Sequence, residues 1–148
     1  MKIILFQPQI PQNTGNIVRT CSVAGAGLVL VRPLGFSTNA RQLKRAGLDY
    51  WSTLAIEEID DLEGYLQSTA CPFYFFSSKA QKLYTEVKYT KESLLIFGNE
   101  TTGLPPLFRQ TYPERFVTLP MKPCQRCLNL ANSAAIALYE AWRQQDFK

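Results

Sequence analysis

Histidine is absent from the 148 residues of this chain. Without it the chain cannot build a Ser-His-Asp triad, a Cys-His pair or a His-Glu-x-x-His metal site. The hydrolases and metalloproteases that depend on these arrangements are therefore excluded. Any proton transfer has to use arginine, lysine, tyrosine, cysteine, a carboxylate or the solvent.

Cysteine is scarce, with four residues in the chain. Cys124 and Cys127 form a Cys-x-x-Cys pair, while Cys21 and Cys71 are isolated in the sequence. A structural zinc site normally needs four ligands, and a thioredoxin-like pair lies at a helix start after an early strand. Neither pattern is met, so we expect no bound metal and no redox role.

Long hydrophobic runs are also missing. The apolar run at residues 3–6 is too short for a signal peptide, and Pro8 follows it closely. No run approaches the length that crosses a membrane. The composition, with 46% hydrophobic and 19% charged residues, is typical of a globular protein. We expect one cytoplasmic domain over residues 1–148, with a net charge of +4 that permits RNA as a partner without requiring it.

The first strand-to-helix turn lacks the Gly-x-Gly-x-x-Gly fingerprint of dinucleotide-binding folds. It reads PQIPQNTGN, which argues against a standard NAD-dependent oxidoreductase. Lys2–Gln7 is predicted to be a buried strand, and Asn13 or Thr14 to cap a helix that runs to about Ala26. A strand at 28–31 would complete a strand-helix-strand unit with two parallel strands.

A basic helix is predicted at residues 38–46. Positions three and four apart lie on one helix face, so Arg41, Lys44 and Arg45 would form a basic patch. Such a patch serves either as a solvated surface or as a contact for RNA.

The segment 56–67 is acidic and carries apolar residues at helical spacing. We predict one amphipathic helix there, with Ile59, Leu62 and Leu66 facing the core. The aromatic segment 72–76 that follows reads as a strand.

Residues 94–140 hold the most informative part of the sequence. The apolar run 94–97 ends at Gly98, which predicts a buried strand that enters a tight polar loop. A second short strand is predicted at 115–119, before a helix at 129–143 that is rich in small residues. Ligands of open α/β sheets bind at the carboxyl ends of strands. These loops, with the serines that follow the aromatic strand, therefore predict a small-molecule site.

Three stretches of the chain resemble the motifs of the SPOUT superfamily of knotted methyltransferases. They are PQNTGNIVRT at 11–20, LIFGNETTGLP at 95–105, and a third motif from LPM at 119–121 through RCLNLANS at 126–133. RAGLDY at 45–50 and the C-terminal YEAWRQ resemble the TrmL subfamily in particular. The match covers nearly the whole chain in order, so the sequence is identified as a member of this superfamily.

The resemblance implies an α/β fold, in which a mainly parallel sheet is flanked by helices and the last third of the chain forms a deep trefoil knot. It also implies a homodimer and S-adenosylmethionine (AdoMet) as methyl donor. The activity implied by the TrmL type is 2'-O-methylation of the wobble cytidine or uridine in leucine tRNAs. Two alternatives stay open: a ribosomal-RNA 2'-O-methyltransferase of the same superfamily, and a non-catalytic RNA-binding module with this fold.

The resemblance also indicates site residues. The catalytic arginine corresponds to Arg19, which we expect to stabilise charge rather than act as a base, because guanidinium scarcely deprotonates in proteins. Asn13 would support Arg19, and Tyr139 would lie near an active site of the dimer. The AdoMet-binding residues implied are Phe76, Gly98, Leu119, Cys127, Asn129 and Leu130.

Two positions depart from the family pattern, since many relatives carry serine where this chain has Cys127 and Ala131. A backbone contact from Cys127 to AdoMet would tolerate the change, whereas a contact through the serine hydroxyl would be lost. Glu100 lies in the second loop, where a carboxylate could face the sulfonium. We expect it instead to brace the loop by accepting backbone hydrogen bonds.

Overall fold

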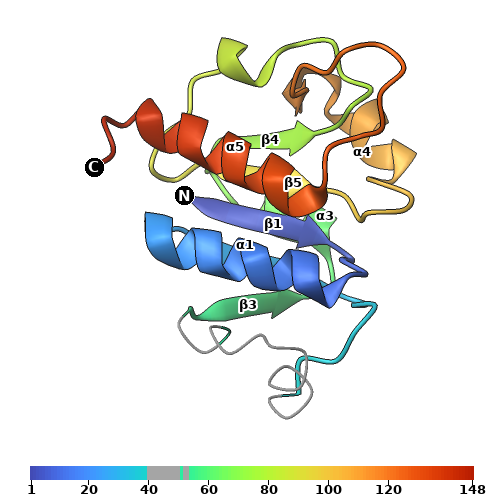
Figure 1. The fold of residues 1–148 in the computed structure, drawn as a ribbon, viewed down its shortest axis with the longest axis vertical. Coiled ribbons are helices and arrows are strands. Elements are labelled where there is room, and N and C mark those ends of the chain that lie inside the picture. The colour runs from blue at the N-terminus through green and yellow to red at the C-terminus, as the bar shows by residue number, and fades with distance from the viewer. Residues whose placement is uncertain (40–50, 52–53) are drawn as a thin grey trace.

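The computed structural model describes residues 1–39, 51 and 54–148 (Figure 1). Within these residues, six strands form one parallel sheet in the order β3-β2-β1-β5-β4-β6. The strands are β1 (Lys2–Phe6), β2 (Gly27–Val31), β3 (Ile56–Ile59), β4 (Phe73–Phe76), β5 (Leu94–Phe97) and β6 (Phe116–Val117). The helices are α1 (Pro11–Ala24), α3 (Leu62–Gln67), α4 (Pro106–Thr111) and α5 (Leu130–Arg143), with short 3-10 helices η2 (Tyr84–Glu86) and η3 (Pro113–Arg115).

The sheet is built outward from β1 in two directions. β1 pairs with β2 on one side and with β5 on the other. The chain completes β2 and β3 on the first side before it starts the other half with β4. In open α/β sheets, such a reversal leaves a crevice at the carboxyl ends of the strands, where ligands bind.

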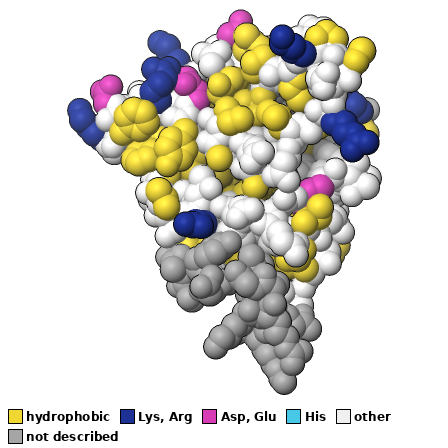
Figure 2. All heavy atoms as spheres, viewed as in Figure 1, with side chains coloured by type: hydrophobic (Ala, Val, Ile, Leu, Met, Phe, Trp, Pro, Cys, Tyr) yellow, Lys and Arg dark blue, Asp and Glu magenta, His cyan; other side chains and the backbone are white. Residues whose placement is uncertain are grey.

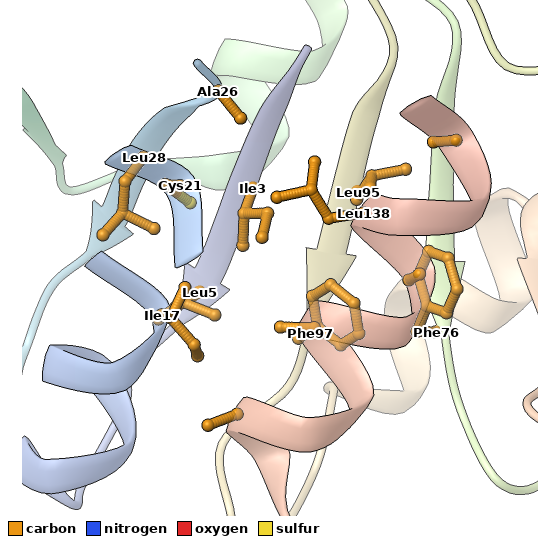
Figure 3. Packing of buried hydrophobic residues seen from close by; sticks show 14 of the residues in the cluster. Ile3, Leu5, Ile17, Cys21, Ala26, Leu28, Phe76, Leu95, Phe97 and Leu138 are labelled. Atoms are coloured by element: carbon orange, nitrogen blue, oxygen red, sulfur yellow. The ribbon is translucent and has the colours of Figure 1, made fainter. Parts of the chain in front are cut away.

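Side chains alternate between the two faces of the buried strands and form two apolar clusters. On one face, Ile3 and Leu5 of β1 pack with Ile17 of α1 and Leu138 of α5 (Figure 3). On the other face, Ile4 belongs to a cluster that includes apolar side chains of α3 and α4. The sheet is therefore the middle of three layers, with α1 and α5 on one side and α3 and α4 on the other.

The small residues predicted in the last helix allow α5 to pack closely. α5 lies beside α1 over the sheet (Figure 1). Its end is fastened by two glutamines: Gln144 Oε1 accepts the Tyr89 N–H at 3.0 Å, and Gln145 Nε2 donates to the Tyr89 carbonyl at 2.5 Å. The buried small residues of α5 are Ala131, Ala134, Ala137 and Ala141.

The predicted helix at 56–67 is wrong in its first half, because Ile56–Ile59 forms strand β3. Leu62 and Leu66 are buried in the remaining helix, as expected. β3 pairs in parallel with β2, and these backbone hydrogen bonds decide its conformation. Exposed residues such as Glu57 hid the strand from pattern reading, since strand preference depends on tertiary context.

Helix α1 begins earlier than its predicted cap. Its first residue is Pro11, which suits a first helical turn because proline has no backbone N–H to leave unpaired. Gly25, with a φ of 66°, ends the helix. The predicted strand-helix-strand unit and the parallel pairing of its strands are confirmed.

From position 40 onward, the predicted basic helix at 38–46 lies outside the described residues, and so do its Arg41, Lys44 and Arg45. In the part of the chain that the structure does describe, no helix is long and apolar enough to cross a membrane.

Candidate active site

A pocket of about 770 Å³ lies at the carboxyl edge of the sheet. The segments that follow β4, β5 and β6 form it together with the start of α5. This volume is in the range of small-molecule and cofactor sites. The structure brings all the predicted AdoMet-binding residues to its lining: Phe76, Gly98, Leu119, Cys127, Asn129 and Leu130.

The loop after β5 folds back so tightly that Gly98 cannot carry a side chain. A Cβ at this position would lie 2.2 Å from the carbonyl carbon of Gly103 and 2.5 Å from the nitrogen of Leu104. Asn99 and Gly103 exchange backbone hydrogen bonds of 3.3 and 3.1 Å. Gly103 has a φ of 70°, which other residues rarely adopt. Both glycines are therefore required by the shape of this loop.

The side chain of Asn99 holds the same loop from inside. Its Oδ1 accepts hydrogen bonds from the backbone N–H of Thr101 at 3.0 Å and of Thr102 at 2.7 Å. The hydroxyl of Thr102 donates to the same oxygen at 3.1 Å. Asparagine often stabilises turns in this way, so the loop is organised before any ligand arrives.

The carboxylate of Glu100 ties this loop to the start of α1. Its Oε2 accepts the N–H of Gln9 at 2.9 Å, and its Oε1 accepts from the N–H of Ile10 at 3.2 Å and from Asn13 Nδ2 at 3.0 Å. A carboxylate is favourable here because the unpaired amides and the helix dipole present positive charge. Glu100 thus has the bracing geometry expected for it.

Asn13 continues the connection to α5. Its Oδ1 accepts from Asn129 Nδ2 at 2.9 Å. Asn129 in turn caps α5, since its Oδ1 accepts the N–H of Ala131 at 2.8 Å. Asn13 is 6% exposed, so its amide is buried with both donor and acceptor in use. Side chains from all three sequence motifs are joined in one hydrogen-bonded network, which we call the Glu100–Asn13–Asn129 network.

Aromatic and aliphatic side chains form the apolar part of the pocket. Phe76 and Phe97 stack with ring centroids 4.6 Å apart and an interplanar angle of 16°. Leu119 lines the pocket beside them. Flat apolar surface next to backbone donors and acceptors suits a nucleoside.

Comparison with known proteins decides the family. The SpoU rRNA Methylase family matches residues 1–139. The chain belongs to this family. A tRNA (cytidine(34)-2'-O)-methyltransferase of Methylovorus glucosotrophus is 46% identical over 147 residues, which cover 98% of this chain and 96% of that protein.

Two solved structures are similar to this chain in three dimensions. One, described as giving insights into the 2-OH methylation of C/U34 on tRNA, has a TM-score of 0.87 and 35% identity, and covers 99% of this chain and 97% of that chain. The other is an AdoMet-bound rRNA methyltransferase from Sinorhizobium meliloti, with a TM-score of 0.83 and 25% identity. It covers 96% of this chain and 55% of that longer chain. The parallel sheet with flanking helices is therefore the SpoU fold, whose trefoil knot stays a prediction for this chain.

Two of the residues predicted to be catalytic in this SpoU family member lie outside the pocket. The described residues that line the pocket include Asn13 but neither Arg19 nor Tyr139. Arg19 is exposed on α1. Tyr139 of α5 is 43% exposed, and its ring meets Trp142 edge-on at 5.6 Å. Both side chains thus belong to the helix pair that covers one face of the sheet.

The cysteines of this SpoU family member are free thiols. Cys124 and Cys127 are exposed, and Cys127 lines the pocket. Cys21 is buried in the core, and this burial raises the pKa of its thiol to about 12. Within the described ranges, no group of three or more His, Cys, Asp or Glu is placed to hold a metal ion.

The pocket also has cationic residues that sequence reasoning missed. Lys79 and Arg109 both line it, and Arg109 Nη2 donates to the Lys79 carbonyl at 2.9 Å. Lys79 could have been found, because it follows the serines at the end of β4. Arg109 lies on α4, thirty positions further along the chain, and no local pattern points to it.

Proposed function

We propose that this protein transfers a methyl group from AdoMet to the ribose 2'-hydroxyl of the wobble nucleotide of leucine tRNAs, cytidine 34 or modified uridine 34. The observation that carries the proposal is the Glu100–Asn13–Asn129 network, which joins three family motifs around one nucleoside-sized pocket. The 46% identity to a tRNA (cytidine(34)-2'-O)-methyltransferase supports the choice of substrate.

The pocket has the shape and chemistry that AdoMet requires. Phe76, Leu119 and Leu130 offer apolar surface to an adenine ring, and the loop after β5 offers backbone groups to a ribose. A ligand can approach the backbone closely at Gly98, because no side chain stands there. Cys127 and Asn129 line the pocket from the segment that precedes α5, so AdoMet would be held between three loops.

When bound in this pocket, AdoMet supplies a methyl group that its sulfonium already activates. The main task of the chain is then to align the ribose, because orientation lowers a barrier by several kcal/mol. Arg19 provides positive charge for the 2'-oxygen as it loses its proton, and it contacts a neighbouring phosphate. The Glu100–Asn13–Asn129 network holds the start of α1 against the pocket, and Arg19 lies further along the same helix.

We also propose that two copies of the chain pair through the outer face of α1 and α5. Val23 is 66% exposed, Ile136 40% and Tyr139 43%, and Figure 2 shows hydrophobic side chains spread over this face. Exposed apolar patches of this kind mark interaction sites. A second copy here would bring Arg19 and Tyr139 to a shared boundary, where a site built by two subunits can use them.

The oligomeric state is tested by substituting one exposed residue on each side of the sheet. Analytical ultracentrifugation should show a dimer for the natural chain and a monomer for Ile136→Glu. Leu107→Glu is the matched control, since Leu107 is 51% exposed on α4, on the opposite face. A monomeric natural chain would overturn the proposed dimer and leave the pocket unaffected.

The activity is tested by titration calorimetry with AdoMet, and by mass spectrometry of leucine tRNA and, in a parallel reaction, of ribosomal RNA, each incubated with the protein and AdoMet. We expect AdoMet binding and a methyl group on the ribose of nucleotide 34. AdoMet binding with methylation of ribosomal RNA alone would favour the related rRNA activity. No AdoMet binding would favour a non-catalytic RNA-binding module.

As part of the same proposal, residues 1–148 act as one catalytic domain in the cytoplasm.

A further inference from the structure

A second pocket of about 560 Å³ lies at the same edge of the sheet, at the ends of β2 and β3. The segment after β2 forms one wall, with Leu34 and Phe36, and the end of β3 forms the other, with Glu58 and Asp60. Arg32 stands between the two walls. No predicted site residue lies in this pocket, and its lining shares no residue with that of the first pocket.

One narrow ridge separates the two pockets. Gln9 lies on it, and its backbone N–H donates to Glu100 of the first pocket at 2.9 Å. On the other side, Gly35 donates its N–H to the Pro8 carbonyl at 2.9 Å, and a Cβ on Gly35 would lie 2.7 Å from Gln9 Cα. Gln9 thus contacts a wall residue of the first pocket and the loop that lines the second, so the two pockets lie next to each other and one nucleotide could occupy both.

The charges of the second pocket disfavour phosphate. Arg32 is held by Asp60 through two hydrogen bonds, from Nε and Nη2, each of 2.8 Å. Glu58 lies 3.9 Å from Arg32, which is too long for a hydrogen bond. Among the lining residues that the structure describes, one cation lies beside two carboxylates, which leaves a net negative charge. A carboxylate placed in this way can accept a hydrogen bond from an exocyclic amino group, as cytosine N4 offers.

The apolar wall suits the face of a base. Phe36 meets Trp51 edge-on, with ring centroids 6.1 Å apart at 86°. This contact can cover at most one face of the Phe36 ring, and the ring lines the pocket. Stacking on an aromatic side chain is the common way in which proteins hold an unpaired base.

We propose that the second pocket binds the base of the nucleotide whose ribose is methylated, with Phe36 against its face and Glu58 accepting from its amino group. The inference rests on the proposed function. It adds a base site that prefers cytosine through Glu58 and still admits uridine against Phe36, distinct from the AdoMet site and from Arg19.

The test uses leucine tRNA assembled to carry cytidine, uridine or an abasic site at position 34. Affinity for each RNA and single-turnover methylation at saturating AdoMet are measured for the natural chain, Phe36→Ala and Glu58→Gln. Phe36→Ala should weaken binding of the cytidine tRNA by roughly tenfold, with no change for the abasic tRNA. Glu58→Gln should lower the preference for cytidine over uridine by about fivefold or more. AdoMet affinity should stay unchanged in both variants.

The control is Glu92→Gln. Glu92 is an exposed carboxylate just before the start of β5, so this change should alter none of these values. Equal weakening of cytidine and abasic tRNA by Phe36→Ala would overturn the base site. So would a natural chain that binds tRNA equally well with and without a base at position 34. If the natural chain shows this base dependence but methylates no tRNA, the proposed function fails while the base site stands.

Discussion

The predicted site residues are divided between two regions, the proposed AdoMet pocket and the outer face of α1 and α5. The two regions are built differently. Around the pocket, buried or half-buried groups such as Asn13 and Asn99 already have their partners within one chain. On the outer face, Arg19 and Tyr139 are exposed side chains on rigid helices. The difference leads us to propose that one chain suffices to bind the methyl donor, and that methyl transfer uses a second surface, from RNA or from another copy.

The largest effect should come from Gly98→Ala, which changes the pocket and leaves the outer face of α1 and α5 intact. The added Cβ would meet backbone at 2.2 Å, so the loop after β5 has to open. We expect AdoMet binding to be lost in calorimetry and stability to fall by about 1–3 kcal/mol. Gly25→Ala is the control: its φ of 66° makes any side chain costly there, but no atom lies within 4 Å of an added Cβ, so it should lower stability without changing AdoMet affinity. Normal AdoMet affinity in Gly98→Ala would show that the pocket is not the binding site.

Arg19→Ala should separate the two regions most clearly. Removal of its positive charge is expected to slow single-turnover methylation by roughly 10²–10³-fold, while AdoMet affinity stays the same. Rapid-quench methylation and calorimetry on one preparation measure both quantities. Lys88→Ala, another exposed cation, should leave the rate unchanged. Weakened tRNA binding with normal chemistry at saturation would reject a catalytic role for Arg19.

Glu100→Gln tests whether the network links the two regions. The amide keeps one acceptor oxygen but loses its charge and the second acceptor, so the amides of Gln9 and Ile10 are no longer both satisfied. We expect a loss of about 1–3 kcal/mol in unfolding free energy, with reduced AdoMet affinity and methylation together. Thermal or urea unfolding measures the first effect. Glu92→Gln should stay within about 0.5 kcal/mol of the natural chain; an equally small effect of Glu100→Gln would contradict the bracing role.

Cys127→Ser should have the smallest effect. Cys127 is exposed and lines the pocket, and serine is close to cysteine in size. AdoMet affinity is therefore expected to change by no more than about threefold in calorimetry. A large gain would show that the family's serine hydroxyl binds the ligand directly and that this chain lacks the contact.

Local patterns predicted most of the fold where one residue type dominates an element. The apolar run of β5, the aromatic run of β4 and the small residues of α5 all lie where they were expected. The prediction was wrong for β3, whose strand conformation comes from pairing with β2. Helical spacing of apolar residues carries no information about such long-range hydrogen bonds.

The sequence by itself determined the class of fold, three loops of the pocket and, through the family resemblance, part of its lining, because short motifs record local backbone needs such as those of Gly98 and Gly103. Only the tertiary structure showed that Glu100, Asn13 and Asn129 form one network, and that a second pocket lies on the other side of Gln9. These features depend on which strands become neighbours in the sheet. Contacts between segments about ninety residues apart are set by that order, and local sequence does not encode it.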